Sequence, residues 1–156
     1  MAVTADMLIA VRVHPTPTED DCKVRITNVN KQRFRSSEFV VPSTDDITID
    51  ADAHDWTNYF KSGLRGALSY IRNRRLNQDF LPRGMDVLVD GTVPIGGGLS
   101  SSAAFVCASA IAVLKANGED KIDKTELVEL AIVSERAVGV FSGGWVRPSP
   151  SSKEEY

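Results

Sequence analysis

Three glycines followed closely by three serines, at residues 96–98 and 100–102, stand between an apolar segment and a long run of small residues. Glycines accept backbone angles that point successive N–H groups in one direction, and they have no Cβ to keep a ligand away. The first turn of a helix has N–H groups without intrahelical partners and carries partial positive charge. A phosphate placed there gains several hydrogen bonds at once, and serine hydroxyls can bond phosphate oxygens or coordinate Mg²⁺. The junction therefore has the chemistry of an anion-binding loop.

The same junction also fits a simple connector, a glycine turn with a serine N-cap. Composition alone leaves both interpretations open, although three glycines cost more conformational entropy than a connector requires. Spacing excludes better-known loops. A Walker A loop needs Lys after its last glycine, where Leu99 stands, and a dinucleotide fingerprint needs Gly where Ser101 stands. A nucleophile elbow needs Gly two residues after its serine, and none is present.

The segments before the loop predict strands. Residues 7–13 form a short run rich in β-branched side chains, and residues 23–29 alternate polar and apolar side chains with a period of two. Residues 39–41 are a further apolar fragment, closed by Pro42. These three segments predict an antiparallel sheet with turns. Residues 85–90 predict another strand, which leads directly to the glycines.

Three segments predict helices, which makes the chain α+β. The first has Asp55 as its N-cap, ends before Pro82 and Gly84, and has its large apolar residues at intervals of three and four. Those residues are Trp56, Tyr59, Phe60, Leu64, Leu68 and Ile71. Residues 103–116 are apolar on nearly every face, which predicts a largely buried helix that ends at residues 117–118. The third begins at Asp123, with Glu126 as in a capping box, and continues toward Gly139.

The composition is that of an ordinary globular protein of 156 residues, with 42% hydrophobic and 25% charged residues. A net charge of -3 gives no electrostatic reason to expect nucleic acid or an anionic membrane as a partner. The longest apolar stretches are broken before they reach the length of a membrane span. The one dense basic cluster, residues 72–75, is interpreted as a solvated helix end.

Cys22 and Cys107 are the only cysteines and lie far apart, which predicts reduced thiols in a cytoplasmic protein. Cys107 lies within an apolar run and is expected in the core. Neither cysteine has a His or a second Cys at metal-ligand spacing, and His14 and His54 are isolated. We therefore expect no metal site built from soft ligands.

Residues 94–104, Pro-x-Gly-x-Gly-Leu-Ser-Ser-Ser-Ala-Ala, resemble the nucleotide-binding signature of the small-molecule kinases that include galactokinase, homoserine kinase and mevalonate kinase. Residues 1–11, 55–63 and 134–144 narrow the resemblance to the fungal galactokinases, in order and with family-like spacing. The resemblance implies an N-terminal lobe over residues 1–144, incomplete at its start, with a mixed sheet packed against helices as in ribosomal protein S5 domain 2. Residues 145–156 are then a tail outside the family, expected to be disordered.

The implied activity is transfer of the ATP γ-phosphoryl group to the C1 hydroxyl of galactose, assisted by Mg²⁺. In that family the signature loop wraps the triphosphate and one serine helps to hold the metal, a role carried over to Ser101 and Ser102 without deciding between them. The expected nucleotide-binding residues are Pro94, Gly96, Gly97, Gly98, Leu99, Ser100, Ser101, Ser102 and Ala103, with Trp56 and Tyr59 beside the adenine. For Trp56 and Tyr59, a core-facing role remains equally open. Ser142 and Gly143 are expected close to the sugar.

The chain departs from the family pattern in two places. Family members have Met-Asp-Gln after the paired glycines, with the Asp beside the reacting hydroxyl, whereas this chain has Val146 at the Asp position, so no catalytic residue is assigned. The Gly-Glu-His-Asp-Tyr-type sugar-binding stretch of the family would precede Met1. Base assistance is typically worth ~10²–10⁴-fold in rate. We therefore expect a truncated chain with little or no kinase activity, and an exposed sheet edge that favours aggregation.

Two other interpretations remain. Fungi also use galactokinase-like proteins as galactose- and ATP-dependent inducers that engage a transcriptional regulator, and these typically lack a Ser-Ala pair in the serine loop. Ser102 and Ala103 are both present here, which favours the kinase. The chain could also be a product that folds poorly and has no function.

Overall fold

Alternation of apolar and polar residues gives the sheet one buried and one exposed face. The structure is a computed structural model and describes residues 4–15, 22–43, 47–50, 52–53, 55–75, 80–95, 98–136 and 138. Within these residues the strands are β1 (Met7–Val13), β2 (Lys23–Asn28), β3 (Ser37–Val40) and β4 (Met85–Gly91). The inner face is almost fully buried, and its residues on the two central strands are Val24, Ile26, Met85, Val87 and Val89. The strand predictions are confirmed to within two residues at each end.

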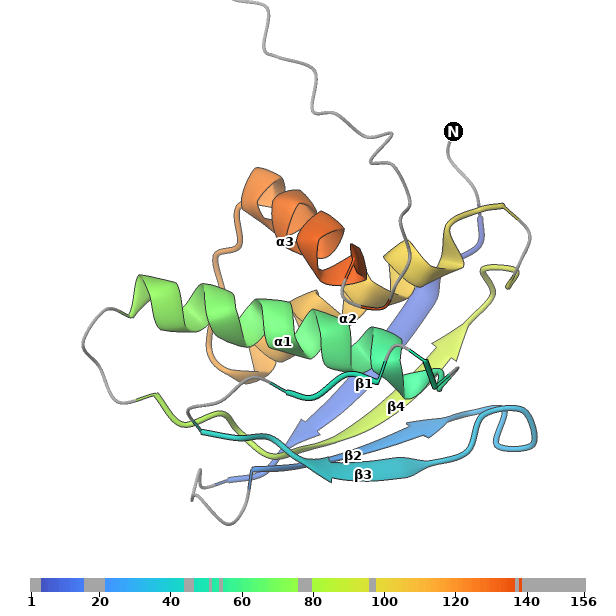
Figure 1. Cartoon of the computed structure of the whole chain (residues 1–156), viewed down its shortest axis with the longest axis horizontal. Helices are drawn as coiled ribbons and strands as arrows, with labels where there is room; N and C mark the ends of the chain where they lie inside the picture. The colour runs from blue at the N-terminus through green and yellow to red at the C-terminus, as the bar shows by residue number, and fades with distance from the viewer. Residues whose placement is uncertain are drawn as a thin grey trace, which may run out of the picture.

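The pairing of the strands corrects one prediction. The order in the sheet is β1-β4-β2-β3, with β1 and β4 antiparallel, β2 and β3 antiparallel, and β2 and β4 parallel. The antiparallel sheet predicted for the opening segments is therefore right for β2 and β3 but wrong for β1, because β4 returns to lie between β1 and β2 (Figure 1). Side-chain periodicity fixes which face of a strand is buried, not which strand lies beside it. The mixed sheet implied by the family resemblance is confirmed.

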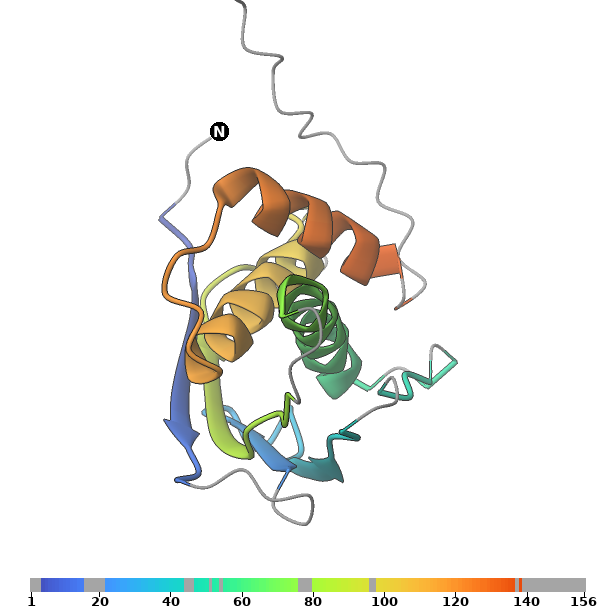
Figure 2. The same ribbon diagram turned by 90° about the vertical axis from the view of Figure 1, so that its left-hand side faces the viewer.

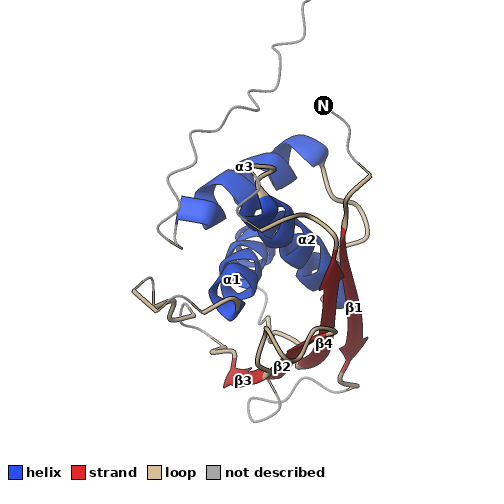
Figure 3. Cartoon of the chain, turned by 90° about the vertical axis from the view of Figure 1, so that its right-hand side faces the viewer, coloured by secondary structure: helices blue, strands red, loops and turns tan. Residues whose placement is uncertain are grey.

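The helices are α1 (Thr57–Arg74), α2 (Ser101–Ala116) and α3 (Lys124–Arg136). They cover one face of the sheet, and α3 lies farther from the strands, against α1 and α2 (Figures 2 and 3). The predicted burial of α2 is confirmed, since only Ile111 and Lys115 are exposed along it. No helix within the described residues is long and apolar enough to span a membrane.

The helix ends follow the predicted signals. The carboxylate of Asp55 accepts the backbone N–H of Thr57 at 2.9 Å, one residue before the N-cap position that Trp56 occupies. Asp123 accepts the N–H groups of Glu126 and Thr125 in the first turn of α3, and these bonds lower the pKa of its carboxyl. At the end of α2, Gly118 has φ +87° and the backbone forms the paired bonds of a Schellman motif.

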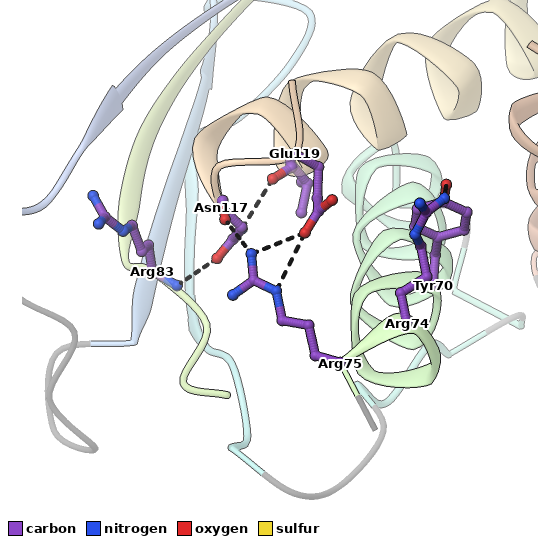
Figure 4. Close-up of polar contacts among 7 residues, drawn as sticks. Tyr70, Arg74, Arg75, Arg83, Asn117 and Glu119 are labelled. Carbon is purple, nitrogen blue, oxygen red and sulfur yellow. Dashed lines mark hydrogen bonds and ion pairs between the residues drawn. The ribbon is translucent and has the colours of Figure 1, made fainter. Parts of the chain in front are cut away.

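The arginines lie at the end of α1 and are partly exposed, as the sequence indicated, and they also form contacts with neighbouring elements. Figure 4 shows Arg75 reaching the end of α2, where it donates to the Glu119 carboxylate at 2.8 Å and to the Asn117 carbonyl at 3.1 Å. Arg74 contacts Glu126 of α3 at 3.2 Å, and the hydrogen bond between Tyr70 and Glu126 raises the pKa of the Tyr70 hydroxyl. The cluster ties α1 to the connection between α2 and α3.

The two cysteines differ in burial, and Cys107 is not in the core as expected. Both are free thiols, but Cys22 is fully buried, with its Sγ 3.0 Å from the Pro82 carbonyl oxygen. Cys107 is only half-buried on α2, and this partial burial raises the pKa of its thiol. The prediction of a core Cys107 is wrong because α2 is apolar on nearly every side, so its sequence does not reveal which side faces the core.

A row of alternating charges crosses the exposed face of the sheet. The register pairs Arg12 with Asp86, Asp86 with Arg25, and Arg25 with Glu38. Arg12 Nε donates to the Asp86 carboxylate at 2.9 Å, and Arg25 Nε donates to Glu38 at 2.6 Å. Opposite charges at directly paired positions stabilise neighbouring strands. The hydrogen bond from Arg12 lowers the pKa of Asp86, with His14 as a further partner.

We predict that Asp86→Asn lowers the free energy of unfolding by about 0.5–1 kcal/mol near neutral pH. Because the folded-state pKa of Asp86 is depressed, its contribution is present above the unfolded-state pKa and is lost as pH falls through the folded-state value. Urea unfolding of both proteins near pH 7 and near pH 3 measures the difference. Glu38→Gln is the control and should have a smaller effect, since the side chain of Glu38 is 48% exposed and that of Asp86 only 23%. An equal loss for Asp86→Asn at both pH values would contradict the prediction.

Candidate functional site

The backbone between β4 and α2 turns twice into the left-handed region. Gly98 has φ +70° and Ser100 has φ 53° and ψ 48°. An added Cβ at Gly98 would meet no atom within 4 Å, so the backbone angle, and not crowding, favours glycine there. Gly96 and Gly97 lie outside the described residues.

The start of α2 has the features of an anion site. Ser100 occupies the N-cap position, but its side chain makes no capping hydrogen bond, and the first turn contains no acidic residue. Ser100 is exposed, and Ser101 and Ser102 are half-buried. The N–H groups of this turn are therefore not satisfied by a side-chain cap, and they carry the positive end of the helix dipole.

Ser100 is the one described non-glycine residue with a positive φ, and this predicts opposite effects of two substitutions. Ser100→Gly should raise the free energy of unfolding by about 0.5–1 kcal/mol, because glycine avoids the cost of the left-handed conformation. Gly98→Ala should lower it by about 1 kcal/mol for the converse reason. Thermal or urea unfolding of the two variants checks both signs. If both variants shift stability in the same direction, the loop conformation described here is wrong.

A cavity of about 270 Å³ opens beside this loop. It lies among the end of β4, the loop, the first turns of α1 and α2, and the connection between β2 and β3. It brings together four of the predicted site residues, Trp56, Tyr59, Ser101 and Ser102. Pro94, Gly98, Leu99, Ser100 and Ala103 are described but do not line it. The predicted sugar-side residues Ser142 and Gly143 lie outside the described residues, as does Val146.

One wall of the cavity is aromatic. Trp56 stacks on Phe105 of α2, with ring centroids 6.0 Å apart and planes at 11°, and it meets Phe34 at 5.5 Å. The Trp56 indole N–H donates to the Arg35 carbonyl at 2.9 Å, so this donor is already used within the protein. Trp56 and Tyr59 also pack against the hydrophobic core. Each of these residues therefore packs inward, as the core-facing interpretation predicts, and also lines the cavity, while contact with the adenine stays a prediction.

A buried carboxylate lies behind the serines. Ser102 Oγ donates to Glu135 Oε1 at 2.8 Å, and Glu135 is only 6% exposed. A buried charge is costly unless it is hydrogen-bonded, paired or bound to a metal. The sequence analysis assigned no role to Glu135, because its burial depends on how α3 packs and the sequence pattern of the helix does not show it. Phe34 and Phe105 were also missed, although Phe105 follows Ser101 by one helical turn.

The charges around the cavity limit what can hold a phosphate there. The described residues that line the cavity include no lysine or arginine, whereas Asp55 and Asp90 are present. Among the described residues, no cluster of three or more His, Cys, Asp or Glu is placed to hold a metal. Mg²⁺ is commonly bound by one or two carboxylates together with substrate phosphates. Glu135 is not among the residues that line the cavity, but its carboxylate contacts Ser102, which is, and this pair of oxygen ligands fits that type of site, in which the bound ligand completes the coordination.

Comparison of the sequence with known proteins gives matches to one family of kinases. Residues 58–147 match the model of the GHMP kinases N terminal domain. The chain is 39% identical to a galactokinase of Candida albicans and 40% identical to one of Schizosaccharomyces pombe, in each case over 92% of the chain. It spans 27% and 28% of the length of these two curated relatives.

Solved structures agree with this match. A galactokinase of Lactococcus lactis, solved in complex with galactose, superposes with a TM-score of 0.65 at 25% identity, over 90% of this chain and 32% of that one. The mevalonate kinase of Methanococcus jannaschii gives a TM-score of 0.61 at 17% identity, over 86% of this chain and 38% of that one, and shows the fold alone.

Proposed function

Because the chain belongs to the GHMP kinase family, we propose that it forms the ATP-binding lobe of a galactokinase. The reaction is transfer of the ATP γ-phosphoryl group to the C1 hydroxyl of galactose. The observation that carries the proposal is that one cavity gathers Trp56, Tyr59, Ser101 and Ser102 beside the exposed first turn of α2. The galactokinase relatives and the galactose-bound solved galactokinase support the choice of sugar.

The phosphates bind at the loop and the first turn of α2. The backbone N–H groups of that turn point out of the helix end, and the left-handed angles at Gly98 and Ser100 shape the approach to it. Gly96 and Gly97 belong to the same proposed cradle. Pro94, Leu99 and Ala103 flank it and act through the backbone, since their side chains do not line the cavity.

Ser102 and Glu135 hold Mg²⁺ against the phosphates. Their 2.8 Å contact distinguishes Ser102 from Ser101, for which no such carboxylate partner is found among the described residues. Ser101 lines the cavity and its hydroxyl bonds a phosphate oxygen. When bound, Mg²⁺ would supply positive charge that the described part of the cavity lining does not provide, and would neutralise charge on the transferring group.

The base lies against the aromatic wall. Trp56 has no free indole donor, so it contributes stacking surface and no hydrogen bond. Tyr59 and Phe105 extend this surface inside the cavity. We place the adenine here because the wall lies beside the proposed phosphate cradle in the same cavity.

Turnover by this chain alone is expected to be low. Val146 stands where the family has an aspartate beside the reacting hydroxyl, and Ser142 and Gly143 are the proposed sugar contacts. Ser102 and Ala103 are both present, which favours a kinase over the inducer-like alternative. We also propose that the protein is located in the cytoplasm.

Displacement of a fluorescent ATP analogue from the purified chain tests the proposal. With Mg²⁺ present, ATP and ADP should displace the analogue at least ~10-fold better than AMP, because AMP lacks the phosphates that reach the cradle and the metal. Galactose phosphorylation, followed in parallel, should be slow or absent. Equal displacement by AMP, or no binding of the analogue, would overturn the proposed ATP site. Rapid phosphorylation would overturn the expectation of low turnover.

A further inference from the structure

The last turn of α3 is held by two different helices through adjacent residues. The backbone carbonyl of Ser134 accepts a hydrogen bond from Ser62 Oγ of α1. The carboxylate of the next residue, Glu135, accepts one from Ser102 Oγ of α2 at 2.8 Å. Ser62 therefore fixes the backbone at the position immediately before the carboxylate that faces Ser102.

Ser62, Ser134 and Glu135 are all buried, and Ser102 is half-buried. Ser62 is 1% exposed and Ser134 is 6% exposed. A Cβ added to Gly66 would meet Ser134 Oγ and would lie 2.9 Å from Leu130 Cδ2, so α1 touches α3 directly beside this bond. Helices α1, α2 and α3 pack against one another, as Figure 2 shows.

The position of the Glu135 carboxylate matters because Mg²⁺ requires nearly ideal octahedral geometry, with ligand distances of about 2.0–2.1 Å. The hydrophobic effect that holds the helices together is not directional, so it does not by itself orient one carboxylate toward a metal ion. The Ser62 hydrogen bond is directional and lies next to the ligand in the chain. Groups that orient a metal ligand commonly change metal affinity by 10–100-fold when they are removed.

We propose that Ser62 is a positioning residue of the metal site, which holds the end of α3 so that Glu135 and Ser102 face the same cation. Ser62 touches neither nucleotide nor metal and acts only through Ser134 and Glu135. This inference rests on the proposed ATP and Mg²⁺ site.

Ser62→Ala, with Ser109→Ala as the matched control, tests the proposal in the full chain. Ser109 is also a fully buried helical serine, but its hydroxyl donates to the Phe105 carbonyl within its own helix. For Ser62→Ala, the Mg²⁺ concentration that gives half-maximal ATP binding should rise about 10-fold, whereas ATP binding without Mg²⁺ stays unchanged. Ser109→Ala should leave both quantities unchanged. Equal Mg²⁺ dependence in the two variants would overturn the proposal.

Hydrogen exchange of the ligand-free chain separates this proposal from the proposed function. Ser62→Ala should speed exchange of the backbone amides of residues 134–136 at least ~10-fold, and Ser109→Ala should not. If the wild-type chain binds no ATP but exchange responds as expected, the proposed function fails and Ser62 retains only its role in holding α3. If exchange at residues 134–136 is the same in both variants, Ser62 does not position α3, whatever the chain binds.

Discussion

Glu135→Gln is expected to raise the Mg²⁺ concentration needed for half-maximal ATP binding by about 10- to 100-fold. Glutamine has the size of glutamate and can still accept the hydrogen bond from Ser102, but it lacks the charge that attracts a cation. Because Glu135 is only 6% exposed, the neutral side chain also avoids the cost of burying a carboxylate. Stability should therefore stay constant or rise while metal-dependent binding falls.

The opposite directions of these two effects separate a binding role from a structural one. Calorimetric titration with ATP at increasing Mg²⁺ gives the binding constants, and urea unfolding gives the stability. Glu129→Gln is the matched control, since Glu129 lies on the same helix and is exposed. If Glu135→Gln and Glu129→Gln bind Mg²⁺ and ATP alike, Glu135 is not a metal ligand.

Gly63→Ala is expected to lower the free energy of unfolding by about 1–3 kcal/mol, although Gly→Ala within a helix normally stabilises by about 0.5–1 kcal/mol. The sign reverses because the new Cβ would lie 2.6 Å from the Val106 carbonyl oxygen and 2.8 Å from Ser109 Cβ. The carbonyl belongs to the backbone of α2 and cannot move aside as a flexible side chain can. Helices α1 and α2 must therefore separate, which also displaces the aromatic wall formed by Trp56 and Phe105.

A double variant identifies the cause of the destabilisation. Gly63→Ala combined with Ser109→Gly removes the contact with Ser109 Cβ but keeps the contact with the Val106 carbonyl. Partial recovery, relative to the sum of the two single variants, is the expected result in urea unfolding. A Gly63→Ala protein as stable as the wild type would show that α1 and α2 do not approach as closely as described.

The strands were predictable because their cause is local. β1 was predicted at the observed residues, and β4 to within one residue. The signal of each strand, alternating side chains or a run of β-branched residues, lies within a few neighbouring positions of the sequence. The partner of β1 was not predictable, because β4 reaches it from more than 70 residues away in the chain. The same limit applies to Arg75, whose partners at residues 117 and 119 depend on how α1 meets the end of α2.

The candidate site divides in the same way. The glycine and serine loop and Trp56 were predicted as site residues because their residue types and their spacing can be recognised within one short segment of the sequence. Glu135 was not, because its significance lies in its distance to Ser102, which is set by helix packing. The contacts of Trp56 also became visible only in the structure. Its indole N–H donates to the Arg35 carbonyl and its ring stacks on Phe105.

The most direct test of the ATP site is a nuclear magnetic resonance titration of the chain with ATP and Mg²⁺. A chain of 156 residues suits a nitrogen–proton correlation spectrum, in which the backbone amides and the tryptophan indole groups are separate probes. The account predicts that the largest shifts fall on residues 98–102 and on the Trp56 indole, with none on Arg12 or Arg25 of the opposite sheet face. Shifts centred on that outer face, or an unchanged spectrum at millimolar ATP, would contradict the assignment of the cavity as the nucleotide site.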